Sequence, residues 1–187
     1  MTIGTIAISS RYASLVLLVV LALGIQGCRK PATLDTIITE KTDTKFNEWL
    51  FRVKDDFSAN SLKEIKDARQ EIRYQVMTIE TGLPFEESQR RVYEKIAGKS
   101  VRNLLIKGYE MKAIRKVGII NIGNRYFLRI NSRIGKEPDP EHRATLERAI
   151  ATVAKRIEAH RKELKGYDAR IAELQTELST KTESATH

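Results

Sequence analysis

The residue with the clearest chemical potential is Cys28, the only cysteine in a chain of 187 residues. Its thiol is a nucleophile, but a single cysteine cannot form a disulfide within the chain. The three histidines, His142, His160 and His187, lack the helical spacing of metal ligands. No glycine-rich phosphate loop, nucleophile elbow or HExxH motif occurs. These residues predict no enzyme, no cofactor and no metal site, and they leave one thiol to explain.

Cys28 ends an uncharged, strongly apolar run that begins at residue 12, directly after the single positive charge of Arg11. The apolar part has the length of a secretory signal core and is short for a membrane span. The run closes with Ile25, Gln26, Gly27 and Cys28. This ending resembles the lipobox of bacterial lipoprotein precursors. The resemblance implies that a signal peptidase removes residues 1–27 after the small Gly27 and that Cys28 carries a lipid.

The lipid would be the anchor of the mature chain. Several acyl chains, each contributing about 0.8 kcal/mol per buried methylene, hold a protein durably on a bilayer. The resemblance further implies that Arg29, which is not Asp, permits sorting to the periplasmic face of the outer membrane in a host that has one. Two other interpretations of this segment stay open. It is an uncleaved single-pass anchor, or an ordinary secretory signal with an incidental thiol.

The net charge of +9 is concentrated in the middle of the chain. Residues 85–136 hold thirteen basic and four acidic side chains, whereas basic and acidic residues nearly balance in 28–84 and in 137–187. We expect this segment to contact an anionic lipid head group or cell-wall polymer rather than a nucleic acid, because the chain is exported. A merely solvated basic face is the alternative. The candidate binding residues are Lys112, Arg115, Lys116, Arg125 and Arg129.

Periodicity predicts a mainly α fold with one β-hairpin, an α+β class. We expect a tether over 28–43 and a helical domain over 44–136. Within that domain, residues 117–131 predict a β-hairpin, because two β-branched and aromatic arms flank Gly123-Asn124.

Residues 139–181 predict one long helix that starts with Asp139 as N-cap and Pro140 as first helical residue. Its apolar residues alternate spacings of four and three, which is a coiled-coil seam. The seam consists of Leu146, Ile150, Val153, Ile157, Leu164, Tyr167, Ile171, Leu174 and Leu178, with His160 at one seam position. Flanking charges favour an antiparallel over a parallel self-pairing; packing on the first two helices of the same chain is the alternative. Residues 182–187 are expected to be disordered.

Taken together, the sequence predicts a non-enzymatic, lipid-anchored protein of the cell envelope that acts in structure or assembly through its C-terminal helix. The alternative function is binding of an anionic surface through residues 85–136. No metal and no nucleic acid is expected as a partner.

Overall fold

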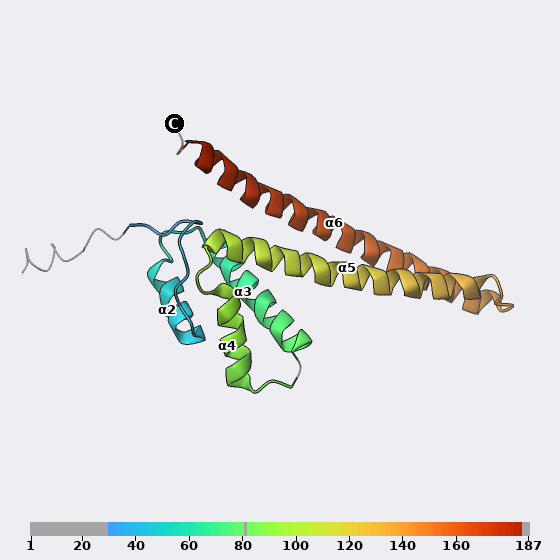
Figure 1. Ribbon diagram of the computed structural model, residues 1–187. Coiled ribbons are helices and arrows are strands. Elements are labelled where there is room, and N and C mark those ends of the chain that lie inside the picture. The colour runs from blue at the N-terminus through green and yellow to red at the C-terminus, as the bar shows by residue number, and fades with distance from the viewer. Residues whose placement is uncertain (1–29, 81, 185–187) are drawn as a thin grey trace, which may run out of the picture. The chain divides into compact units, whose positions relative to one another are not determined.

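A computed structural model describes residues 30–80 and 82–184, with side chains described as far as residue 177. From Ala32 onwards the described chain belongs to one compact unit. Within the described residues there are five helices (Figure 1). They are α2 (Asp43–Arg52), α3 (Ala59–Ile79), α4 (Phe85–Ile96), α5 (Val101–Ile134) and α6 (Pro140–Ser184).

Side-chain caps fix where four of these helices begin. Thr42, Ser58 and Ser100 precede α2, α3 and α5, and each side chain accepts a hydrogen bond from a backbone N–H in the first turn. At α6, Oδ1 of Asp139 accepts from the backbone N–H of Glu141 at 3.0 Å. These caps satisfy backbone donors that have no partner within the helix. The start of α6 is the one expected from the Asp-Pro pair.

The β-hairpin expected at residues 117–131 is wrong, because this segment is the second half of α5. Throughout the described part of the chain there is no strand, and the fold is therefore all-α rather than α+β. The described residues form one isolated antiparallel β-bridge, between Ile37 and Ser100. Local β propensity was overridden by burial, because the same isoleucines and phenylalanine that suit a strand also form a helical stripe.

Gly123 has a different role from the turn residue that the sequence suggested. Positive φ angles among the described residues occur at Gly82 and Gly98, in the connections before and after α4, and not at Gly123. A β-carbon at position 123 would lie 3.0 Å from Cγ1 of Ile157 on α6. The missing side chain therefore lets two helices approach closely and does not serve a hairpin turn.

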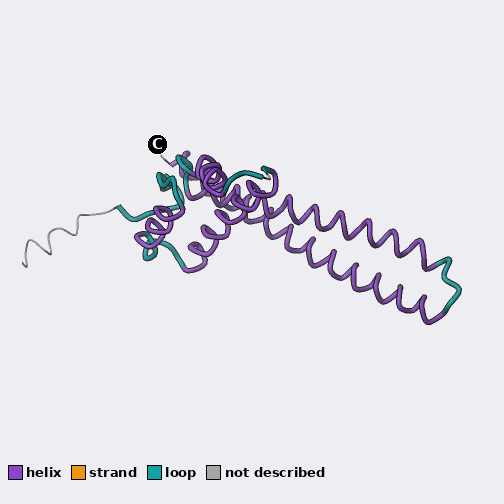
Figure 2. Tube along the Cα trace, turned by 90° about the horizontal axis from the view of Figure 1, so that it is seen from below, coloured by secondary structure: helices purple, strands orange, loops and turns teal. Residues whose placement is uncertain are grey.

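Helices α5 and α6 run side by side in opposite directions and are joined by residues 135–139 (Figures 1 and 2). At about 1.5 Å per residue, the 34 residues of α5 span about 50 Å. From Lys116 onwards, the residues of α5 that are not fully exposed recur at heptad spacing. They are Lys116, Ile120, Gly123, Phe127, Ile130 and Ile134, with Asn124 beside the stripe. This part of the hairpin is a two-helix antiparallel coiled coil.

The main core lies where α2, α3 and α4 meet the first half of α5. Its centre contains the aromatic residues Phe46, Trp49 and Tyr93, with the Phe46 and Trp49 ring centroids 5.4 Å apart. Gly108 marks the crossing of α5 over α3, because a β-carbon there would lie 2.4 Å from Cβ of Ala68. The backbones are thus in direct contact at this point, which fixes the position of the hairpin on the core.

The tether expected at 28–43 is not free along its length. Residues 28 and 29 lie outside the described residues, but Ile38 is completely buried. The backbone N–H groups of Val101 and Arg102 donate to the carbonyl oxygens of Thr36 and Leu34, at 3.0 and 2.7 Å. The segment therefore caps the first turn of α5 with its own carbonyl groups, and it is part of the folded unit.

Two glycines inside α5 should respond to alanine with opposite signs. Gly118→Ala should raise the free energy of unfolding by about 0.5–1 kcal/mol, because alanine favours the helix and nothing lies within 4 Å of the new β-carbon. Gly108→Ala should lower it by about 1–3 kcal/mol, because the new β-carbon meets Ala68. Urea denaturation of the two variants measures both changes. Equal effects would contradict the backbone contact at Gly108.

Candidate functional site

The basic residues expected to bind an anionic surface do not form one patch. They are Lys112, Arg115, Lys116, Arg125 and Arg129. Lys112 lies 3.4 Å from a carboxylate oxygen of Asp67, and Arg115 pairs with Glu71; both acids are on α3. These two cations hold α3 against α5, so they contribute little positive potential to the surface.

Lys116 is part of the helix–helix seam. Its Nζ lies 2.6 Å from Oε2 of Glu163 and 3.2 Å from Nδ1 of His160, both on α6. The hydrogen bond from Lys116 lowers the pKa of Glu163 below its ordinary value. Since only 15% of the lysine side chain is exposed, this group forms a polar layer between the helices and is not open to an external anion.

Arg125 and Arg129 remain available on the second half of α5. Both are exposed, and neither makes an ion pair with any residue that the structure describes. Residues 117–134 contain Arg125, Arg129 and Arg133 and no acidic residue. Two large apolar side chains, Ile122 before Arg125 and Tyr126 directly after it, are 61% and 49% exposed. We call these five residues the distal α5 face.

The heptad seam of α6 faces α5. Each seam residue whose side chain is described is buried or half-buried, whereas the side chain of Leu178 lies outside the described residues. Ile157 and Leu174 are buried most deeply, at 7% and 0% exposure. The seam is therefore covered by the same chain. The alternative expectation, that this long helix packs on the first two helices of the same chain, is wrong, because α6 packs mainly on α5.

The contacts between the two helices repeat every seven residues. Arg102, Tyr109 and Lys116 of α5 are seven apart, and they meet Leu174, Tyr167 and His160, which are seven apart in the opposite direction. This repeat is the register of an antiparallel coiled coil. It was hidden in the sequence, because α5 has an arginine, a lysine and a glycine at positions where a seam normally has apolar residues.

Tyr109 ties the seam to α3. Its ring lies 5.9 Å from that of Tyr167, and its hydroxyl donates to Glu64 at 2.8 Å. Arg170 of α6 donates to the same glutamate at 2.9 Å. Burial and the hydrogen bond to Glu64 raise the pKa of Tyr109 to about 12. One carboxylate of α3 thus joins all three long helices.

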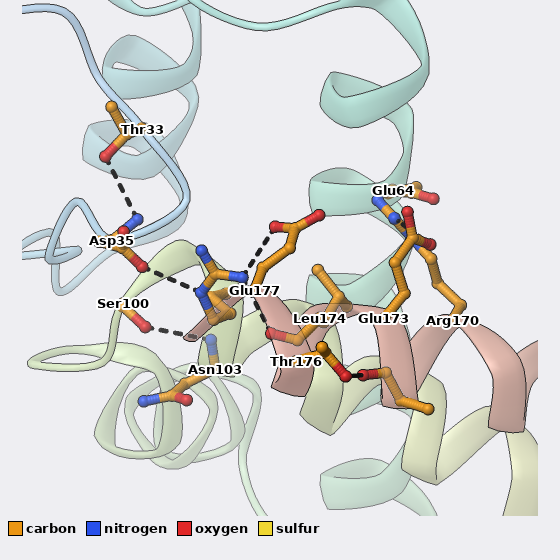
Figure 3. Close-up of polar contacts among 12 residues, drawn as sticks. Thr33, Asp35, Glu64, Ser100, Asn103, Arg170, Glu173, Leu174, Thr176 and Glu177 are labelled. Atoms are coloured by element: carbon orange, nitrogen blue, oxygen red, sulfur yellow. Dashed lines mark hydrogen bonds and ion pairs between the residues drawn. The ribbon is translucent and has the colours of Figure 1, made fainter. Parts of the chain in front are cut away.

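Among the residues whose side chains the structure describes, Arg102 is the most deeply buried charged one, with 1% exposure. Its Nε donates to Asp35, and its Nη1 donates to the carbonyl oxygen of Leu174 and to Glu177, all at 2.9 Å (Figure 3). Burial by itself lowers the pKa of an arginine, but the two carboxylates outweigh it and the pKa of Arg102 is raised. This guanidinium joins the segment before α2, the start of α5 and the end of α6.

Two adjoining hollows lie between α3 and α5, the larger one also bordered by the end of α4, and the sequence did not point to them. One has a volume of about 510 Å³ and the other about 280 Å³, and both are lined by Gln75 and Met111. Three lysines of the basic segment line the larger hollow: Lys95, Lys99 and Lys107. We call the two hollows together the α3/α5 groove. Its lysines come from three different places in the fold, so no local spacing could have selected them.

Cys28, the expected lipid attachment residue, and Gly27, the expected cleavage-site residue, lie outside the described part of the chain. In the residues that the structure describes, no group of three or more His, Cys, Asp and Glu side chains could hold a metal ion. Among the same residues, no helix combines the length and the apolar composition needed to cross a bilayer.

No protein family model matches the chain, and neither a curated protein nor a solved structure shows significant similarity to it.

Removing the Arg102 charge should weaken the fold. Arg102→Met keeps most of the volume but removes three hydrogen bonds, so the free energy of unfolding should fall by about 2–4 kcal/mol. The control is Arg161→Met on the exposed surface of α6, which should change it by less than about 0.5 kcal/mol. Chemical denaturation measures both. If Arg102→Met is as stable as the unmodified protein, the three contacts do not hold these segments together.

Stability should fall at high pH through Tyr109. The pKa of Tyr109 is about 12 in the folded protein against 10.0 for an ordinary tyrosine, so ionisation favours the unfolded chain. The contribution is complete below pH 10 and is lost as the pH rises towards 12. Thermal unfolding followed across this range should show a shallower decline for Tyr109→Phe. An identical pH profile for this variant would contradict the role of Tyr109.

Proposed function

We propose that the protein is a non-enzymatic lipoprotein of the cell envelope that acts in structure or assembly, with the second half of the α5/α6 hairpin as its contact element. One observation carries the proposal. Contacts between α3 and α5 include Ala68 with Gly108 and Glu71 with Arg115, whereas α5 continues to Ile134. Beyond Arg115, the residues of α5 that are not exposed recur at the heptad spacing of a seam with α6.

The second half of α5 exposes several large apolar side chains. Beyond Arg115, those that are at least 40% exposed are Val117, Ile119, Ile122, Tyr126 and Leu128. Contiguous exposed apolar residues rimmed by polar ones are typical of protein–protein contact sites. Since the seam residues of α6 are covered by α5, the outer face of the hairpin, rather than the seam, would make the contact.

The anchor supports the same function. A lipid on Cys28 would hold the chain at a membrane, and the segment from Ala32 to Thr42 packs on the folded unit. The distance between the lipid and the helical unit would then be short, a few residues at about 3.5 Å each. The anchor would therefore keep the folded unit at the membrane.

A second function, binding of an anionic surface, is favoured by the distal α5 face alone. Arg125, Arg129 and Arg133 lie in a stretch without acidic residues. Each basic residue near an anionic bilayer contributes about 1 kcal/mol, and salt screens this attraction. In this function the arginines make the contact, whereas in the first function the apolar side chains do.

Cell fractionation and site-specific crosslinking test these functions. Cys28→Ser should move the protein from the membrane fraction to the soluble fraction and remove the lipid from its intact mass. A photocrosslinking side chain at position 122 should give a discrete protein adduct in intact envelopes, and one at position 155, exposed on α6, should not. Adducts at neither position would contradict the contact element.

The dependence of vesicle binding on salt concentration tests the second function separately from the first. Binding of the Cys28→Ser protein to vesicles with anionic lipid should then weaken strongly at high ionic strength, and Arg125→Gln with Arg129→Gln should abolish it. Vesicle binding that is absent, or that is unchanged by salt, would rule this second function out and leave the first unaffected.

A further inference from the structure

We propose that the α3/α5 groove binds a long-chain fatty acid, with the carboxylate at the lysine end and the acyl chain along the apolar end. The inference is independent of the proposed envelope function, because it rests on the groove alone. The two hollows have volumes of about 510 and 280 Å³, within or close to the range of small-molecule sites. They adjoin at Gln75 and Met111, so a single elongated ligand can occupy both.

The larger hollow supplies the positive charge. Lys95, Lys99 and Lys107 line it from the end of α4, the following turn and α5. Two of these are partly neutralised, since Lys107 lies 3.0 Å from Glu110 and Lys95 lies 3.9 Å from Glu80. Lys99 is exposed and makes no ion pair within the described part of the chain. The remaining charge is close to one unit, which matches a head group with a single negative charge.

The larger hollow also has apolar lining residues. Ile72 and Leu104 are already buried, at 1% and 2% exposure, so the apolar surface that a ligand can cover there belongs mainly to the half-buried Ile106. A small inorganic anion would leave this apolar surface uncovered, because it has no apolar part. A ligand that carries an anionic head and a hydrocarbon chain contacts both the lysines and this apolar surface.

The smaller hollow continues the apolar surface. It is lined by Tyr74, Ile79 and Ile114, which are 50%, 69% and 68% exposed. The two charged residues that line it, Glu71 and Arg115, pair with each other. Three large apolar side chains therefore face a hollow with no unpaired charge. Covering them with methylene groups is favourable by about 25 cal/mol per Å² of apolar surface.

Titration of the purified chain with three matched probes tests the ligand class. Palmitate has both features, the corresponding fatty alcohol has the chain without the charge, and acetate has the charge without the chain. Palmitate, kept below its aggregation concentration, should bind saturably with one site per chain. The alcohol should bind at least tenfold more weakly, and acetate should not bind detectably. Equal binding of palmitate and the alcohol, or no saturable palmitate binding, would overturn the proposal.

Matched variants test the location. Combined Lys95→Gln, Lys99→Gln and Lys107→Gln should weaken palmitate binding at least tenfold. The same change in charge on α6, with Lys155→Gln, Lys162→Gln and Lys165→Gln, should change it less than twofold. Circular dichroism verifies that both variants are folded. If the two triple variants bind palmitate equally, the carboxylate does not lie at these lysines and the proposal fails.

A second pair of variants tests where the acyl chain of palmitate lies. Ile114 lines the groove and Leu128 does not, although their exposures are nearly equal, 68% and 65%. Ile114→Asn should weaken palmitate binding about fivefold or more, and Leu128→Asn should leave it unchanged. A photoreactive palmitate should label α3 and α5 near residues 74–79 and 111–115. Labelling of the distal α5 face instead would overturn the assignment.

Discussion

The packing of α6 along α5 is the constraint on which the rest of the structure depends. A helix of 45 residues with one apolar stripe is unstable with that stripe in water, and α5 is the helix that mainly covers it. Helix α5 has 34 residues and runs antiparallel to α6. The need to cover one helix therefore decides the conformation of the other, including a segment whose local propensity favours a strand.

Polar groups set the register of this packing, and apolar groups provide most of the surface buried between α5 and α6. Arg102, Lys116 and Glu64 each have a specific partner on α6, and a shift by one heptad would leave at least one of these charges buried without a partner. Gly123 adds a steric condition, because a β-carbon there would lie 3.0 Å from Cγ1 of Ile157, closer than most β-carbon contacts. Polar residues inside a coiled coil are known to specify register in this way.

The same contacts divide the basic middle segment into three groups of residues. Lys112, Arg115 and Lys116 are paired with acids and hold helices together. Lys95, Lys99 and Lys107 line the α3/α5 groove, and Arg125 and Arg129 remain on the exposed second half of α5. An excess of basic residues in a stretch of sequence therefore does not show where the protein surface is positively charged. Each basic side chain is neutralised or exposed according to its neighbours in space.

The sequence by itself determined the long helix after Asp139, the seam that it buries and the apolar stripes of the first helices, because these depend on spacings within single helices. It predicted a lipid anchor at Cys28, which the described residues do not include. It did not determine the partner of the seam, the helical state of residues 117–131, the burial of Arg102 or the groove. Only the tertiary structure decided these, because each depends on residues that lie far apart in the chain, and a glycine or lysine at a seam position has no local signature.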